Sequence, residues 1–197
     1  MARLLEHHGK ALLREAGIAT PNGVLASSAR DARAAAEGIG FPVALKAQVL
    51  AGKRGLAGGI AFADDAAQAD AVAERLFATP VYGLPVRELL VEAKCAIEHE
   101  LYVAVVSDTR ARAPVMVVST SGGMGIEEAD PSTTVSAPVD VLNGAPVYWC
   151  LHLVGSLALT EPVRLELALI CAALYTLYWR YDCTLAESTR WRSPRAA

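Results

Sequence analysis

Short apolar runs alternate with longer helical patterns along this 197-residue chain, and no other feature restricts its fold as strongly. Apolar residues three and four positions apart predict helices, whereas short apolar runs between turn residues predict strands. Predicted helices cover residues 3–16, 27–38, 64–77, 148–157 and 161–178. Predicted strands cover residues 41–49, 59–62, 89–93, 100–106, 113–119 and 183–187. The alternation predicts an α/β or α+β fold, with a turn at residues 21–23 and an irregular segment at residues 129–147.

Composition and charge exclude several function classes. Hydrophobic residues make up 53% of the chain and charged residues 20%, which allows a buried core and excludes wholesale disorder. The formal net charge is −3, so no general positive field attracts nucleic acid or an anionic membrane. The most apolar stretch, residues 165–178, is shorter than the ~20 residues that cross a bilayer, and it predicts a buried core helix.

Cysteine spacing favours reduced thiols and a cytoplasmic location. The cysteines are far apart and include no C-x-x-C pair: Cys95, Cys150, Cys171 and Cys183. The N-terminus has no apolar run followed by a cleavage site, so no signal peptide is expected. The four histidines form no evident triad with a serine or cysteine nucleophile, and they are interpreted as structural or surface residues.

Lys46 and the glycine-rich segment 51–59 form the first candidate site. A lysine inside an apolar strand is costly to bury without an anionic partner. A glycine-rich loop lets backbone N–H groups approach phosphate oxygens, and Lys53 and Arg54 would add charge-assisted contacts. The loop lacks the Gly-Lys-Ser/Thr ending of a P-loop. A flexible surface hairpin with a snorkelling lysine explains the same residues equally well.

Two further segments are candidates on weaker grounds. Glu92 interrupts the apolar run 89–93, and a buried carboxylate needs a donor, such as an adenine amino group or a ribose hydroxyl. Together with Cys95 and Glu100 it forms the second candidate, for which two solvent-facing carboxylates are the favoured alternative. Residues 119–125, Ser-Thr-Ser-Gly-Gly-Met-Gly, could hold an anion, although a tight turn is favoured.

Taken together, these segments resemble one family. The segments LLEHHGKALLREAGIATPNG, ALKAQVLAGKRGLAGG, LLVEAKCAIEHELYVAVVSD, VVSTSGGMGIEE and DCTLAE are similar, in order and spacing, to parts of ADP-forming succinate–CoA ligase β subunits. The resemblance covers about Arg3 to Glu187. It implies an ATP-grasp fold, in which a nucleotide lies between two lobes, here about residues 20–95 and 96–187.

The resemblance implies a role for each candidate residue. The implied nucleotide-binding residues are Lys46, Lys53, Arg54, Gly55, Glu92, Cys95 and Glu100. Lys46 and residues 53–55 would contact the phosphates of ATP. Glu92 and the Cys95 backbone would hold the adenine end, and Glu100 would meet the nucleotide at its ribose. Lys53 stands where the family often has glycine, which adds positive charge to the loop.

The resemblance also implies a reaction. Family members use ATP to phosphorylate a histidine of a partner α subunit, and the phosphate then passes to succinate, which reacts with coenzyme A. Glu187 matches a glutamate near that phosphohistidine and is the implied catalytic residue. Mg²⁺ would bridge the ATP phosphates and neutralise charge as the phosphoryl group moves.

The resemblance ends at Glu187. The family continues Ile-Asn-Pro-Leu, in which the asparagine binds Mg²⁺, whereas this chain continues STRWRSPRAA. We therefore expect no metal ligand, no C-terminal CoA-ligase domain and no activity of this chain alone. One inserted base converts a permitted codon set for Ser-Thr-Arg-Trp-Arg into Ile-Asn-Pro-Leu-Ala. Residues 188–197 are thus interpreted as a frameshifted tail after an ATP-grasp domain at residues 1–187, with a genuine short paralogue as the alternative.

Three functions stay open at this point. The first is the ATP-binding part of a succinate–CoA ligase β subunit. The second is the same part of a malate–CoA ligase or another ADP-forming acyl-CoA ligase, because the acid-recognising residues would lie largely outside this chain. The third is a non-catalytic nucleotide- or partner-binding fragment.

Overall fold

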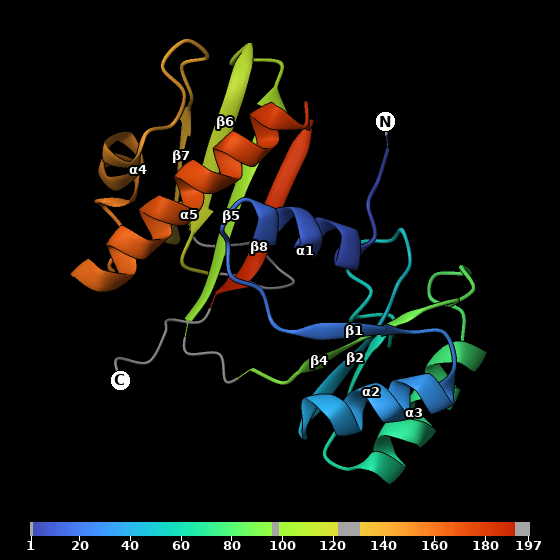
Figure 1. The fold of residues 1–197 in the computed structure, drawn as a ribbon. Helices are drawn as coiled ribbons and strands as arrows, with labels where there is room; N and C mark the ends of the chain where they lie inside the picture. The colour runs from blue at the N-terminus through green and yellow to red at the C-terminus, as the bar shows by residue number, and fades with distance from the viewer. Residues whose placement is uncertain (1, 96–98, 122–130, 192–197) are drawn as a thin grey trace. The chain divides into compact units, whose positions relative to one another are not determined.

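The computed structural model describes residues 2–95, 99–121 and 131–191, and it consists of two compact units (Figure 1). Unit 1 contains Met1–Leu12 and Ala19–Cys95, and unit 2 contains Leu13–Ile18 and Ala96–Ala197. Each unit has a four-stranded antiparallel sheet accompanied by helices. The mixed α/β class predicted from the sequence is therefore confirmed.

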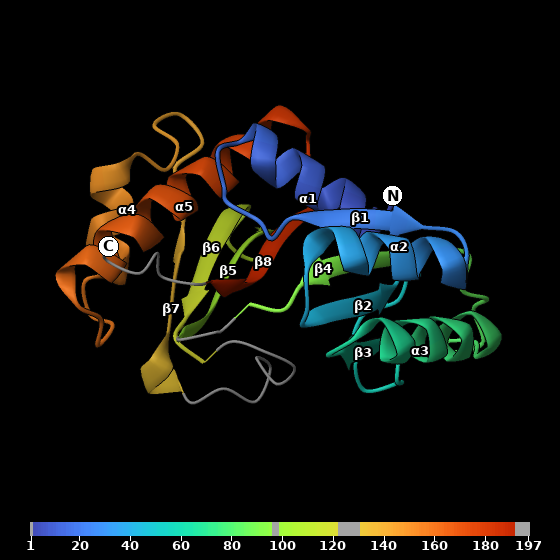
Figure 2. The same cartoon turned by 60° about the horizontal axis from the view of Figure 1, so that its bottom comes forward.

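Unit 1 has its sheet in the order β1-β4-β2-β3. The strands are β1 (Gly23–Ala26), β4 (Leu89–Ala93), β2 (Val43–Ala47) and β3 (Ile60–Ala63). Helices α2 (Ala29–Ile39) and α3 (Ala66–Ala78) lie together on one face of this sheet (Figures 1 and 2). Ser28 and Asp65 cap the two helices, because each side chain accepts a hydrogen bond from a backbone N–H of the first turn.

Side-chain alternation divides the two central strands of unit 1 into two faces. Val43, Leu45 and Val91 are fully buried in the core shared with α2 and α3. Lys46 and Glu92 are each one position away from these residues, so they point to the opposite face. Helix α1 spans Glu6–Glu15, and its residues 6–12 belong to unit 1. These residues contact the second face through hydrogen bonds and ion pairs. The second face therefore carries charged groups that are shielded from water.

Unit 2 has its sheet in the order β7-β6-β5-β8. The strands are β7 (Thr134–Pro138), β6 (Ala113–Ser119), β5 (His99–Asp108) and β8 (Leu185–Trp191). Helix α5 (Glu161–Arg180) packs against β5 and β8, and α4 (Val147–Val154) packs against α5 and β7 (Figure 2). Among the described residues, α5 alone is long and apolar enough to suit a membrane span as well. Eight of its residues are buried inside unit 2, as in the core helix that the sequence predicts.

Most predicted elements are found within a few residues of their expected bounds, but three differ. Residues 23–26 form β1, which the sequence did not predict and which begins at the last residue of the predicted turn 21–23, because each of these residues pairs with a residue of β4. The segment 129–147 was predicted to be irregular, yet it contains the short 3-10 helix η2 (Pro131–Thr133) and strand β7, which is held by pairing with β6. Strand β8 continues to Trp191, beyond the predicted end at Glu187, because Ser188 pairs with Val103.

Candidate functional site

Five charged side chains gather on the second face of the unit 1 sheet, and we call them the charged cluster. Its members are Glu6, Lys10, Lys46, Arg54 and Glu92. Helix α1 supplies the first two, strand β2 the third, the loop after β2 the fourth and strand β4 the last. Three cations face two carboxylates, so the cluster has a formal charge of 3 − 2 = +1.

Glu92 is the most deeply buried member of the charged cluster, with 1% of its surface exposed. Its Oε2 atom accepts a hydrogen bond from Lys46 Nζ at 2.5 Å, and its Oε1 atom accepts one from Lys10 Nζ. The pairing of β2 with β4 places Ala44 opposite Glu92, so Lys46 reaches the carboxylate as a diagonal neighbour on the same face. A buried carboxylate needs such partners. The lysine and the glutamate that the sequence singled out are therefore partners of one another.

Gly23 on β1 leaves the space that the Glu92 side chain occupies. The two residues are opposite one another in the β1–β4 pairing. A Cβ atom at Gly23 would lie 2.8 Å from Glu92 Cγ, which is too close for two carbon atoms. The glycine at this position therefore allows the carboxylate to turn toward the two lysines.

Glu6, the first residue of α1, links the remaining cations. Its Oε1 atom lies 2.9 Å from Lys10 Nζ and 3.2 Å from Lys46 Nζ. Its Oε2 atom forms an ion pair with Arg54 Nη2. About one fifth of the Glu6 side chain is exposed, so this carboxylate is more accessible than that of Glu92. The three cations of the cluster thus converge on the partly exposed carboxylate of Glu6.

The glycine-rich loop uses part of its backbone internally. The N–H groups of residues 56–59 donate to carbonyl oxygens of Lys53, Arg54 and Gly55. The Tyr82 hydroxyl donates to the Lys53 carbonyl oxygen at 3.1 Å, which ties the tip of the loop to the segment after α3. Backbone amides of residues 56–59 are therefore engaged within the loop. The same loop places the Arg54 side chain in the charged cluster and leaves the Lys53 side chain exposed.

The Lys10 ammonium is the titrating group that the site perturbs most clearly. Burial, together with the positive charge of Lys46, lowers the pKa of Lys10 from 10.5 to about 8, although Glu92 acts in the opposite direction. Because the pKa is lower in the folded state than in the unfolded chain, the folded state binds fewer protons between about pH 8 and pH 10.5. The contribution of Lys10 to stability therefore increases as the pH rises through that window.

We expect a heteronuclear NMR titration of the lysine side chains to show Lys10 losing its proton near pH 8. In a Lys46→Met variant the pKa of Lys10 should rise, because a neighbouring positive charge is removed and Glu92 is left with Lys10 alone. A Lys10 signal that titrates at the ordinary value of 10.5 would contradict the buried position of this ammonium.

The other predicted site residues lie outside the charged cluster. Cys95 follows β4 and is half-buried, with its thiol 3.7 Å from the Ala93 carbonyl oxygen. Glu100 lies on β5 and Glu187 on β8, both in unit 2, and the Glu187 carboxylate accepts a hydrogen bond from the Tyr102 hydroxyl at 3.0 Å. In the segment 119–125, residues 119–121 are described, whereas residues 122–125 lie outside the described residues.

Sequence reasoning missed Glu6 and Lys10. The N-terminal helix was identified from its leucines, and its charged residues were assigned to no site. A signal existed, because Glu6 and Lys10 are four positions apart and so lie on one side of a helix. What that side would contact depended on where α1 packs, which the sequence pattern does not state.

The charged cluster suits an anionic ligand better than a metal ion. Lysine and arginine side chains are the usual donors to phosphate oxygens, and here they already surround a carboxylate. Within the described ranges, no three His, Cys, Asp or Glu side chains gather to hold a metal ion. The charged cluster therefore fits the phosphates of a nucleotide better than it fits a metal ion.

Comparisons with known proteins agree on one fold. A family model described as the ATP-grasp domain matches residues 3–189. The β subunit of an ADP-forming succinate–CoA ligase from Rubrobacter xylanophilus is 38% identical over 187 residues, which are 93% of this chain and 49% of that protein. The chain thus spans about half the length of the curated relatives that it matches.

Two solved structures extend the comparison. The dinucleotide-forming acetyl-coenzyme A synthetase 1 of Ca. Korarchaeum cryptofilum, solved with coenzyme A and Ca-AMPCP, has a TM-score of 0.74 and 14% identity, and the match covers 96% of this chain and 88% of that one. The ATP citrate lyase of Methanothrix soehngenii has a TM-score of 0.70 and 18% identity, covering 97% and 47%. At these identities the likeness concerns the fold alone, and it agrees with the fold expected from the sequence.

Proposed function

This chain belongs to the ATP-grasp family, and from that premise we propose that it is the nucleotide-binding part of an ADP-forming acyl-CoA ligase of the succinate–CoA ligase type. The observation that carries the proposal is the convergence of Lys46, Lys10 and Arg54 on the Glu6 carboxylate at the second face of the unit 1 sheet. Such a set of cations offsets the negative charge of a polyphosphate. The identity with succinate–CoA ligase β subunits supports the same assignment.

In this proposal Lys46 and Arg54 contact the phosphates of ATP, and Lys53 adds charge at the tip of the loop. Glu92 positions Lys46, because its carboxylate is committed to two lysines on the second face of the sheet. That role differs from the contact with the adenine end that the resemblance implied for this residue. The Cys95 backbone at the adenine end and Glu100 at the ribose keep their predicted roles as part of the proposal.

The complete reaction would need parts beyond the charged cluster. We propose that a partner α subunit provides the phosphorylated histidine and the coenzyme A site, with Glu187 near that histidine, and that the assembly is cytoplasmic. Bound ATP would supply the phosphoryl group, and the residues of this chain would bind and orient its phosphates. Succinate is the acid suggested by the relatives, and malate or another carboxylic acid is the alternative that the described residues leave open.

ATP binding tests the proposal directly. We expect isothermal titration to show saturable binding of ATP to the purified chain. Arg54→Met should weaken this binding roughly tenfold, because one charge-assisted contact to phosphate is lost. Arg33→Met is a matched control, since Arg33 pairs with Glu37 on α2 and lies outside the charged cluster. The absence of saturable binding to the folded wild-type chain, with and without Mg²⁺, would contradict a nucleotide-binding role.

A further inference from the structure

We propose that Glu6 limits the affinity of the anion site for phosphate, because its carboxylate contacts both Lys46 and Arg54 and competes with a phosphate-bearing ligand for these two cations. This inference rests on the proposed function and adds a feature that the resemblance did not imply. The helix α1 would thereby carry an internal competitor for the site that β2 and the glycine-rich loop provide.

The contacts of Glu6 are those that a phosphate would make. One carboxylate oxygen lies within 3.2 Å of Lys46 Nζ and 2.9 Å of Lys10 Nζ, and the other forms an ion pair with Arg54 Nη2. Carboxylate and phosphate oxygens use the same lysine and arginine donors. A phosphate oxygen at this position would therefore have to replace the Glu6 carboxylate as the partner of these donors.

The two carboxylates of the cluster differ in how readily a ligand could displace them from their cationic partners. Glu92 is almost fully buried and is held between two lysines on the sheet. Glu6 is about one fifth exposed and stands at the first residue of α1, where the helix dipole favours a negative charge. Displacement of the Glu6 carboxylate toward solvent therefore leaves it in a favourable position, whereas displacement of Glu92 would leave a buried charge without its partners.

Charge balance leads to the same conclusion. The cluster carries +1 with both carboxylates in place, and a polyphosphate brings several negative charges to the same cations. Two anions at one position repel each other, so the carboxylate and the ligand exclude one another. Removal of the Glu6 charge should therefore make the site available to the ligand without removing any donor.

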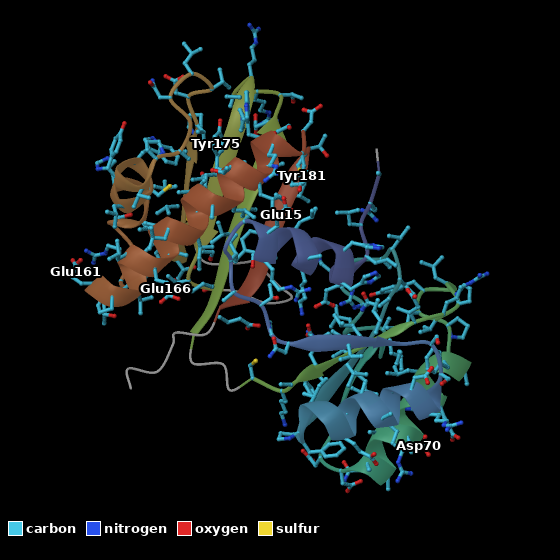
Figure 3. All side chains as sticks on the ribbon, viewed as in Figure 1. Glu15, Asp70, Glu161, Glu166, Tyr175 and Tyr181 are labelled. Atoms are coloured by element: carbon cyan, nitrogen blue, oxygen red, sulfur yellow. The ribbon has the colours of Figure 1, made fainter. Side chains whose placement is uncertain are left out.

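The test compares Glu6→Gln with Glu15→Gln, using inorganic pyrophosphate and ATP as separate probes. Glu15 lies on the same helix but pairs with Arg180 and Tyr181 in unit 2, and Figure 3 shows it beside Tyr181. We expect Glu6→Gln to bind both probes about tenfold more tightly than the wild-type chain, and Glu15→Gln to bind them as the wild-type chain does.

A double variant separates competition from net charge. Glu6→Gln combined with Lys10→Met has two cations and one carboxylate, so the formal charge of the cluster returns to 2 − 1 = +1. If Glu6 competes for the position between Lys46 and Arg54, the double variant still binds pyrophosphate more tightly than the wild-type chain. A return to wild-type affinity would overturn the competition and assign the effect to net charge. The double variant also keeps the test available if the single variant folds poorly.

The remaining outcomes distinguish this inference from the proposed function. If ATP binds the wild-type chain and Glu6→Gln equally well, or binds the variant more weakly, the competition is overturned while the nucleotide-binding role stands. If pyrophosphate binds Glu6→Gln more tightly but ATP binds neither form, the competition is supported and the nucleotide-binding role fails. If neither probe binds either form, both are overturned.

Discussion

Replacement of Glu92 by glutamine is expected to lower the free energy of unfolding by about 3 kcal/mol, because it removes the carboxylate that pairs two shielded lysines. The Lys46 and Lys10 side chains are 12% and 13% exposed, so water compensates little for the lost charge. Glu6 still contacts both ammonium groups in this variant. The expected loss of unfolding free energy is therefore near the lower end of the range of about 3–5 kcal/mol for a broken buried ion pair. The loss should concern unit 1, where all five members of the charged cluster lie.

The measurement has to report on unit 1. The three tryptophans, Trp149, Trp179 and Trp191, belong to unit 2, so tryptophan fluorescence would follow the wrong part of the chain. Hydrogen exchange at the amides of β2 and β4, combined with urea unfolding followed by circular dichroism, would follow the affected sheet. Lower protection is expected in these two strands.

Two further variants make the Glu92 experiment specific. Glu37→Gln removes the partner of Arg33 in an ion pair whose side chains are about half exposed, and it should change stability by less than about 0.5 kcal/mol. Adding Lys10→Met to Glu92→Gln should recover part of the loss, because one of the two unpaired ammonium groups is removed. A loss for Glu92→Gln no greater than that for Glu37→Gln would contradict the buried pairing.

Replacement of Lys46 by methionine is expected to weaken ATP binding by roughly 10- to 100-fold, because a charge-assisted contact in a shielded position is lost. Lys46 lies on a central strand and is held by Glu92, so its ammonium is oriented before a ligand arrives. Arg54 lies in a loop, and its removal is expected to have the smaller effect. Methionine keeps most of the aliphatic chain, so the change concerns mainly the charge.

Lys94→Met is the matched control for this variant. Lys94 follows β4 in the same unit and lies over the Phe62 ring, with 5.1 Å between its Nζ atom and the ring centroid. Lys94 is not a member of the charged cluster, so its replacement should leave the ATP affinity unchanged. Isothermal titration measures both variants, and hydrogen exchange of β2 confirms that Lys46→Met is folded. Unchanged ATP affinity in a folded Lys46→Met chain would contradict the phosphate-binding role of this lysine.

The class of the fold and most of the candidate residues could be predicted from the amino-acid sequence. Alternating helical and strand patterns are local properties, so they could be recognised without knowing which segments meet. Lys46 and Glu92 interrupt apolar strands, and burying a charged side chain without a partner costs free energy. Both residues were therefore candidates, and both belong to the charged cluster. Strands β1 and β7 carry weak local patterns, and they form because a neighbouring strand offers hydrogen bonds along their length.

The way in which the candidate residues combine depends on contacts between segments that are distant in the sequence. Lys46 and Glu92 are 46 positions apart, and the antiparallel pairing of β2 with β4 makes them partners. Glu6 and Lys10 join them because α1 lies against the same face of that sheet. Strand register and helix docking arise from contacts between distant segments, and these depend on the packing of the whole unit rather than on any local pattern. Individual charged residues can therefore be identified from the sequence, whereas their proximity in the charged cluster depends on the fold.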